Sequence, residues 1–278
     1  VTIGDLYGFT GPIESMAGPM HNGADLAVTE ANASGKFLQG TITTYSGDST
    51  CIDAAAAIAE AERLINDHNV MAIMGPNCSG ATKAVVDSVS VPNGILTISS
   101  AATAPSLSDS VDKGLFFRTS PSDTIQAAVL TKVALSRGIT DMAVTHSNSD
   151  YGKGLADSFV TQYLAAGGTV TVLAAHEDDK ADYSADVAAL SAGGSTTLAV
   201  FGYADTGGKG IVTASEDTGA FMDYVFADGM MSETTSGLVA DGSWGTKPAP
   251  SEDLISAWLT VAEAGGVDGS GVFTGESY

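Results

Sequence analysis

Hydrophobic positions along the chain form short runs that alternate with stretches of helical periodicity. Apolar runs bounded by Gly, Pro or Asn, such as residues 70–74 and 95–99, are typical of buried strands. Between the runs, apolar residues recur at the spacing of a helix with one buried face. The pattern therefore predicts an α/β fold with parallel sheets covered by helices. The predicted strands are 2–7, 41–45, 70–74, 95–99, 115–118, 142–146, 169–174, 198–201 and 224–226; the predicted helices are 20–33, 54–65, 81–89, 121–137, 151–166, 185–190, 211–218 and 252–264; and a linker is predicted at 242–250.

The alternation runs once as far as Arg118 and then starts again. Ser120 suits the N-cap position of a new helix, and Pro121 suits its first turn. Two successive runs predict two similar lobes with a ligand cleft between them. We place the first lobe at residues 1–119 and 249–278 and the second lobe at residues 120–248.

Two of the predicted strands end in small polar loops, at residues 78–80 and 101–103, that lead into helical segments. A helix N-terminus presents unpaired backbone N–H groups, and the carboxyl ends of parallel strands meet at one sheet edge. With the hydroxyl groups of Ser79 and Thr103, these loops suit a small carboxylate. The alternative is that both hydroxyls only cap their helices.

The charge and composition of the chain narrow the function classes. Among 278 residues, 11 Lys and Arg stand against 33 Asp and Glu, which gives a formal net charge of −22. Nucleic acids and anionic membrane surfaces require basic patches, so the balance argues against both as partners. No apolar run reaches the length of a transmembrane helix. With 44% hydrophobic residues and 33 glycines, the chain has the composition of a globular protein.

Motifs for catalysis or metal binding are not found in the sequence. The four histidines lack metal-binding spacing, Ser79 lies in no nucleophile elbow, and residues 207–210 lack the Ser or Thr of a phosphate-binding loop. We therefore expect no enzyme, no metal and no cofactor. Cys51 and Cys78 form no C-x-x-C pair, which leaves a disulfide and two separate buried thiols as alternatives.

A series of short motifs extends along nearly the whole chain. They lie at residues 11–12, 23–28, 30–33, 64–67, 75–80, 99–103, 117–121, 150–156, 202–203 and 228–229. In order and spacing they resemble the motifs of the periplasmic leucine/isoleucine/valine-type binding proteins. This resemblance is more specific than any single motif.

The resemblance implies a type I periplasmic binding fold, in which two flavodoxin-like lobes close around a ligand. Members of that family deliver solutes to ABC importers, so it implies an amino-acid ligand and a membrane permease as partners. It also implies a periplasmic protein whose signal peptide has been removed, and we expect a monomer. Cysteines that match Cys51 and Cys78 are bridged in the leucine-binding branch, so we expect a disulfide. The family's last elements have no counterpart here, so we expect the C-terminal part to be missing.

The resemblance further implies a subsite for the ligand's carboxylate. Ser79, Ala101 and Thr103 match the positions that hold this group in the family. Hydroxyls and helix N–H groups complement a carboxylate without a buried cation. Met16 lies with residues 13–15 in a loop that is expected to shape the pocket for the ligand's side chain.

A second set of matched positions implies a subsite for the ligand's ammonium, because a carboxylate and aromatic rings attract a cation. These positions are Tyr151, Tyr203 and Asp228. Asp228 stands where the branched-chain binders have the longer Glu, which leaves the ligand open. Taken alone, Tyr151 is equally an aromatic at a helix start, and Asp228 belongs equally to an Asp-Gly turn.

Other functions remain as alternatives to amino-acid transport. The same fold serves as the sensing domain of receptors and regulators. The alternative ligands are amides, urea-like molecules and small carboxylates. An enzyme is the alternative from another class, and the lack of catalytic motifs argues against it.

Overall fold

Both halves of the alternating pattern fold as parallel sheets flanked by helices, as the sequence predicts. The computed structural model describes residues 1–38, 40–239 and 242–278. It divides into two units, each with one five-stranded sheet. Unit 1 comprises Val1–Thr103, Leu107–Ser120 and Pro248–Tyr278, and unit 2 comprises Ala104–Ser106 and Pro121–Lys247.

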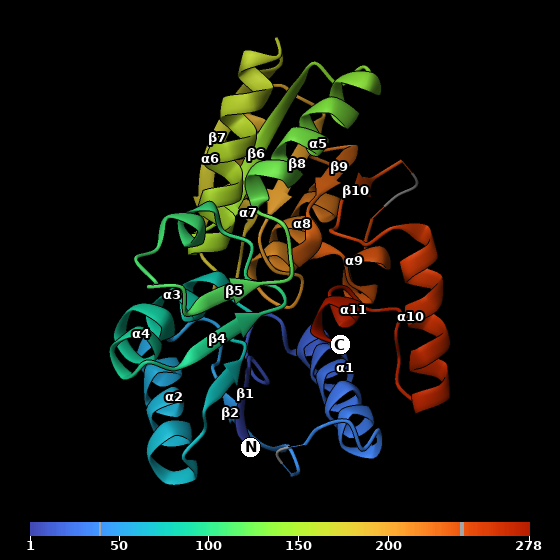
Figure 1. Cartoon of the computed structure of the whole chain (residues 1–278). Helices are drawn as coiled ribbons and strands as arrows, with labels where there is room; N and C mark the ends of the chain where they lie inside the picture. Colours follow the sequence, from blue (N-terminus) through green and yellow to red (C-terminus); the bar gives the residue numbers. More distant parts are fainter. Residues whose placement is uncertain (39, 240–241) are drawn as a thin grey trace. The chain divides into compact units, whose positions relative to one another are not determined.

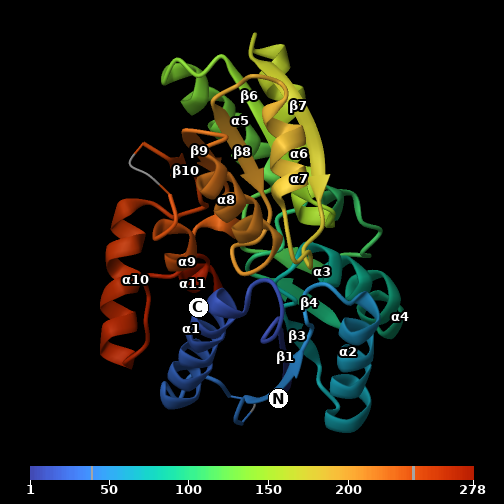
Figure 2. The same ribbon diagram turned by 180° about the vertical axis from the view of Figure 1, so that it is seen from behind.

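The sheet of unit 1 has the strand order β2-β1-β3-β4-β5, with every pair parallel. Helix α1 lies on one face and packs against α10 and α11, while α2, α3 and α4 lie on the other face (Figures 1 and 2). The strands are β1 (Thr2–Tyr7), β2 (Thr43–Asp48), β3 (Ala72–Met74), β4 (Leu96–Ser99) and β5 (Phe116–Arg118). The helices are α1 (Glu14–Ala33), α2 (Ala54–His68), α3 (Ser79–Val85), α4 (Val91–Asn93), α10 (Glu252–Gly265) and α11 (Thr274–Ser277).

Local sequence explains α2 well. Ala57, Ala61 and Leu64 recur at helical spacing, and all three are fully buried against the sheet. Asp53 caps the N-terminus by accepting from the backbone N–H groups of the second and third residues after it. Asn69 ends the helix in the left-handed conformation, which Asn tolerates better than most residues.

The sheet of unit 2 has the order β10-β9-β8-β6-β7, again with every pair parallel. Helices α5 and α6 pack together, as do α7 and α8, and the described core joins α7 and α8 to β8 and β9. The strands are β6 (Asp141–Ser147), β7 (Thr169–His176), β8 (Thr197–Phe201), β9 (Asp223–Phe226) and β10 (Trp244–Gly245). The helices are α5 (Asp123–Ser136), α6 (Asp150–Ala165), α7 (Ser184–Ser191), α8 (Gly207–Thr218) and α9 (Glu233–Ser236).

The two sheets share one topology. In each, the first strand lies between the second and the third, so the chain crosses in opposite directions from that first strand. Ligands of such open sheets bind at the carboxyl ends of the strands next to this reversal. In unit 1 this place lies between β1 and β3, and in unit 2 it lies between β6 and β8.

The first predicted helix begins earlier than the sequence suggests. Pro19 argues for a start after it, because an interior proline removes a backbone hydrogen bond. Helix α1 nevertheless begins at Glu14 and contains Pro19. Ile13, Met16, Ala17 and Met20 form one buried stripe, and this burial outweighs the cost of the proline. The predicted loop around Met16 is therefore wrong, since Met16 lies in the first turn of α1.

Three smaller expectations also need correction. Helix α5 begins at Asp123 with Ser122 as its N-cap, so the predicted cap at Ser120 is wrong. The predicted linker at 242–250 contains the short strand β10, which pairs with β9. Beyond 101–103 the chain forms only a 3₁₀ turn, Pro105–Asp109, so this loop does not lead into an α-helix.

Candidate functional site

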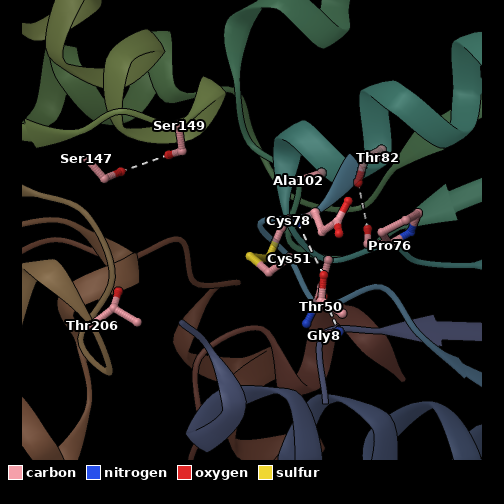
Figure 3. The surroundings of a disulfide bond; sticks show 12 residues. Gly8, Thr50, Cys51, Pro76, Cys78, Thr82, Ala102, Ser147, Ser149 and Thr206 are labelled. Atoms are coloured by element: carbon pink, nitrogen blue, oxygen red, sulfur yellow. Dashed lines mark hydrogen bonds between the residues drawn. A yellow bond between two sulfur atoms is a disulfide. The ribbon is translucent and has the colours of Figure 1, made fainter. Parts of the chain in front are cut away.

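A disulfide joins two loops at the carboxyl edge of the unit 1 sheet. Cys51 lies after the end of β2, and Cys78 precedes the first residue of α3; the two are bonded, with their Cα atoms 5.3 Å apart (Figure 3). The predicted pairing is confirmed. The bond fixes the start of α3 relative to β2.

The loop after β3 is held by side chains from α3 and β4. The carbonyl of Pro76 accepts hydrogen bonds from Thr82 Oγ1 at 2.8 Å (Figure 3) and from Ser99 Oγ at 2.5 Å. Gly75 has a φ of 98°, and a Cβ there would overlap the carbonyl of Leu6 on β1. Glycine is therefore required where this loop crosses the end of β1.

The residues predicted for the carboxylate subsite lie in unit 1, and together with Met16 we call them the unit 1 set. Ser79 opens α3 and is 2% exposed, and Thr103, four residues after β4, is fully buried. Ala101 is partly exposed in the same loop as Thr103. Within the described chain, Thr103 Oγ1 is a buried hydroxyl oxygen with no hydrogen-bond partner. Such an atom is costly to bury unless a ligand or water completes its hydrogen bonding.

The residues predicted for the ammonium subsite lie together in unit 2, and we call them the unit 2 set. Tyr151 stands in the first turn of α6, while Tyr203 follows β8 and Asp228 follows β9. Tyr151 Oη donates to Asp228 Oδ1 at 3.2 Å and accepts from the backbone N–H of Gly229 at 3.0 Å. The rings of Tyr151 and Tyr203 stack with their centroids 5.2 Å apart.

Local capping sets the position of Tyr151. Ser149 is the N-cap of α6, and its Oγ accepts from the backbone N–H of Gly152 at 3.1 Å. A hydrogen bond of 2.8 Å links Ser147 Oγ and Ser149 Oγ and ties the end of β6 to the cap (Figure 3). A Cβ on Gly152 would overlap Ser147, so the helix approaches the strand at a glycine.

Burial dominates the electrostatics of the unit 2 set. Tyr151, Tyr203 and Asp228 are at most 6% exposed. Burial raises the pKa of the Asp228 carboxyl to about 6, although hydrogen bonds from Gln126 and Tyr151 act in the opposite direction. Burial also raises the pKa of both tyrosines, and the charges of Asp228 and Asp123 add to this effect. The surroundings are thus negative and poorly solvated, which favours a cation.

Two buried polar residues near this cluster are not among the residues predicted from the sequence. Gln126 on α5 is 6% exposed and donates from Nε2 to the carbonyl of Thr246 at 2.9 Å. Asp123, the first residue of α5, is fully buried. An Asp at a helix start normally indicates only an interaction with the helix dipole. Their spacing of three residues places them on one helix face, but it does not show that this face is buried.

The described residues contain no group of three His, Cys, Asp or Glu side chains suited to a metal ion. Within the same part of the chain, no helix has the length and apolarity needed to span a membrane.

Comparisons with known proteins show the family of the chain and proteins with the same fold. A family model described as periplasmic binding protein matches residues 1–257. A Leu/Ile/Val-binding protein from Rhizobium johnstonii is 29% identical over 250 residues, which are 88% of this chain and 66% of that protein. The chain thus spans about two thirds of the length of this relative.

Two solved structures show the same fold at low sequence identity. A branched-chain amino acid transporter substrate-binding protein from Streptococcus pneumoniae, in complex with isoleucine, is 22% identical with a TM-score of 0.83; the match covers 100% of this chain and 80% of that one. An ABC transporter solute-binding protein from R. palustris, in complex with 4-hydroxybenzoate, is 20% identical with a TM-score of 0.83; it covers 100% and 77%.

Proposed function

Because the chain belongs to the periplasmic binding protein family, we propose that it is an extracytoplasmic receptor for a small zwitterionic amino acid. It delivers this amino acid to an ABC importer in the membrane. The ligand and the importer are inferred from the chemistry of the two residue sets and from the relatives' amino-acid binding.

The observation that carries the proposal is the buried acid in unit 2. Asp228 is 3% exposed, and its carboxylate accepts a hydrogen bond from Tyr151 Oη. A buried carboxylate is costly unless a cation meets it. The stacked rings of Tyr151 and Tyr203 add attraction for a cation through their π faces. A primary ammonium supplies both the charge and the N–H donors.

The unit 1 set offers groups that complement a carboxylate. Ser79 opens α3, where backbone N–H groups are free of helical partners, and Thr103 offers a buried hydroxyl with unused hydrogen-bonding capacity. Both groups complement a carboxylate without a buried cation. The unit 1 set thus complements a carboxylate and the unit 2 set complements an ammonium, which are the two charged groups of an amino acid.

The side chain of the ligand is expected to be apolar or small. Met16 is buried and offers no charge. Asp228 is one methylene shorter than a Glu, so its oxygens lie about 1.3–1.5 Å further back. A water molecule or a more deeply seated amine fills that distance, which allows an amine somewhat larger than an α-ammonium.

A thermal-shift screen tests this function. The panel contains the aliphatic amino acids, their amides, and small carboxylates that include 4-hydroxybenzoate. A ligand at a hundred times its dissociation constant stabilises the native protein by about 2.7 kcal/mol. We expect the aliphatic amino acids to raise the melting temperature. A rise with 4-hydroxybenzoate and none with any amino acid would overturn the proposal.

A further inference from the structure

The loop that carries Thr103 is fixed by hydrogen bonds with side chains at the ends of β4 and β5. Ser99 Oγ, at the end of β4, accepts a hydrogen bond from the backbone N–H of Ala102 at 3.0 Å and donates to the carbonyl of Pro76. Arg118 Nη1, at the end of β5, donates to the carbonyl of Ala102 at 3.1 Å. Both polar groups of Ala102 are therefore fixed by side chains of adjacent strands.

Strand pairing places the Arg118 guanidinium at this loop. Ser99 and Arg118 are partners in the register of β4 and β5, so they reach the same sheet edge. Arg118 Nη2 also donates to Ser108 Oγ at 2.6 Å. The planar guanidinium thus connects Ala102 to Ser108, which lie on either side of the segment after Thr103.

The hydrogen bond from Arg118 acts on a particular peptide group. The carbonyl of Ala102 and the N–H of Thr103 belong to the same peptide unit. A charged donor at the carbonyl oxygen polarises that unit, which makes its N–H a stronger donor. Ala102 and Thr103 are fully buried and Arg118 is partly exposed, so solvent screens this effect only in part.

Because the chain is strongly acidic, a positive charge near the Thr103 loop has a large effect on the local electrostatic potential. The chain has only three arginines, Arg63, Arg118 and Arg137, and a formal net charge of −22. The field of such a protein disfavours a carboxylate group bound near its surface. A cation beside the Thr103 loop offsets that repulsion locally.

We propose that Arg118 is a positioning residue for the carboxylate group of a ligand: it fixes the Thr103 loop and strengthens the Thr103 N–H as a donor without touching the ligand. This inference rests on the proposed function only for the identity of the ligand. The preference for a carboxylate over a neutral amide then depends on Arg118, although Arg118 does not contact the ligand.

The test compares L-leucine with L-leucinamide, which keeps the ammonium and lacks the carboxylate. Affinities are measured by calorimetry for the wild type and for Arg118→Gln, Arg118→Lys and Arg63→Gln. We expect Arg118→Gln to weaken leucine by about tenfold and leucinamide much less, because only the carboxylate needs the polarised donor. Arg118→Lys should recover part of the loss. Arg63→Gln, the same charge change at an arginine paired with Glu60, should change neither affinity.

Equal losses for leucine and leucinamide, or no loss in Arg118→Gln, would overturn the positioning role. Melting temperatures of all variants show whether folding is affected, and Arg118→Lys keeps the test valid where Arg118→Gln is unstable.

If the wild type binds neither molecule, the proposed function fails, but the role of Arg118 can still be tested on the ligand-free protein. In its NMR spectrum, the amide ¹⁵N signal of Thr103 should shift in Arg118→Gln but not in Arg63→Gln. An unchanged Thr103 signal would contradict the polarisation.

Discussion

At the scale of single residues, the raised pKa of Asp228 couples ligand binding to pH. Burial raises this pKa to about 6, so the carboxyl is ionised above that value and protonated below it. An ammonium binds the ionised form, and below pH 6 a proton competes with it. We predict that the affinity for L-leucine falls as pH drops below about 6, approaching tenfold per pH unit. Calorimetry between pH 8 and 5 measures this, and a flat profile would contradict the role of Asp228.

A second residue-scale prediction concerns the hydroxyl of Thr103. Thr103→Val keeps the shape and removes the buried hydroxyl, so binding should weaken by about 1–3 kcal/mol. Thr131→Val is a matched control, because Thr131 on α5 is also buried with an unpartnered Oγ1 in the described chain. Calorimetry measures the affinity of the wild type and of both variants for L-leucine. If Thr103→Val binds as tightly as the control, the hydroxyl has only a structural role.

The sequence predicted the residues at strand ends better than the residues on helices. Tyr203 and Asp228 follow apolar runs that end clearly, so the parallel topology alone brings them to one sheet edge. Gln126 and Asp123 lie in a helix whose buried face is set by its packing on α6. Polar residues there normally face solvent, and only tertiary structure shows that these two are buried.

At the scale of elements, the disulfide joins the ends of two strands that are not adjacent in the sheet. Cys51 and Cys78 are 27 residues apart, and their bond closes a loop that contains α2 and β3. In the chain-entropy model, a loop of this length stabilises the native state by about 3–4 kcal/mol. We predict that replacing both cysteines with Ala lowers the free energy of unfolding by about that amount.

Urea unfolding of the double variant and of the wild type measures this difference. The wild type with a reducing agent is the control, and it should match the variant. If the double variant is as stable as the oxidised wild type, the disulfide does not add to the free energy of unfolding.

Element boundaries show why sequence patterns reach their limit. Asp53 and Asn69 mark both ends of α2 with capping chemistry, and the predicted start is correct. For α1 the local signals mislead, because Pro19 lies inside the helix and Ile13 provides no side-chain cap. The buried stripe from Ile13 to Met20 decides this boundary, and burial is set by the sheet and the other helices of unit 1.

At the scale of the whole molecule, the two units differ in how they use the chain. Unit 2 consists of the continuous stretch Pro121–Lys247 together with the short segment Ala104–Ser106. Its described core lies inside the continuous stretch. We predict that residues 121–247 expressed alone fold, with helical circular dichroism and dispersed NMR signals. A fragment of residues 1–120 should be much less stable, since Leu26 packs on Trp258 and Ala262 of α10. A disordered 121–247 fragment would contradict this.

Whether Asp228 binds the ammonium of an amino acid is tested by calorimetric titration of the wild type, Asp228→Asn and Asp217→Asn with L-leucine and with 4-hydroxybenzoate. Asp217 is exposed on α8 and controls for the loss of one negative charge. We predict that wild type and Asp217→Asn bind leucine alike, and that Asp228→Asn binds it at least about tenfold more weakly because a charge-assisted contact is lost. Tight binding of 4-hydroxybenzoate that is undiminished in Asp228→Asn, with no binding of leucine, would contradict it.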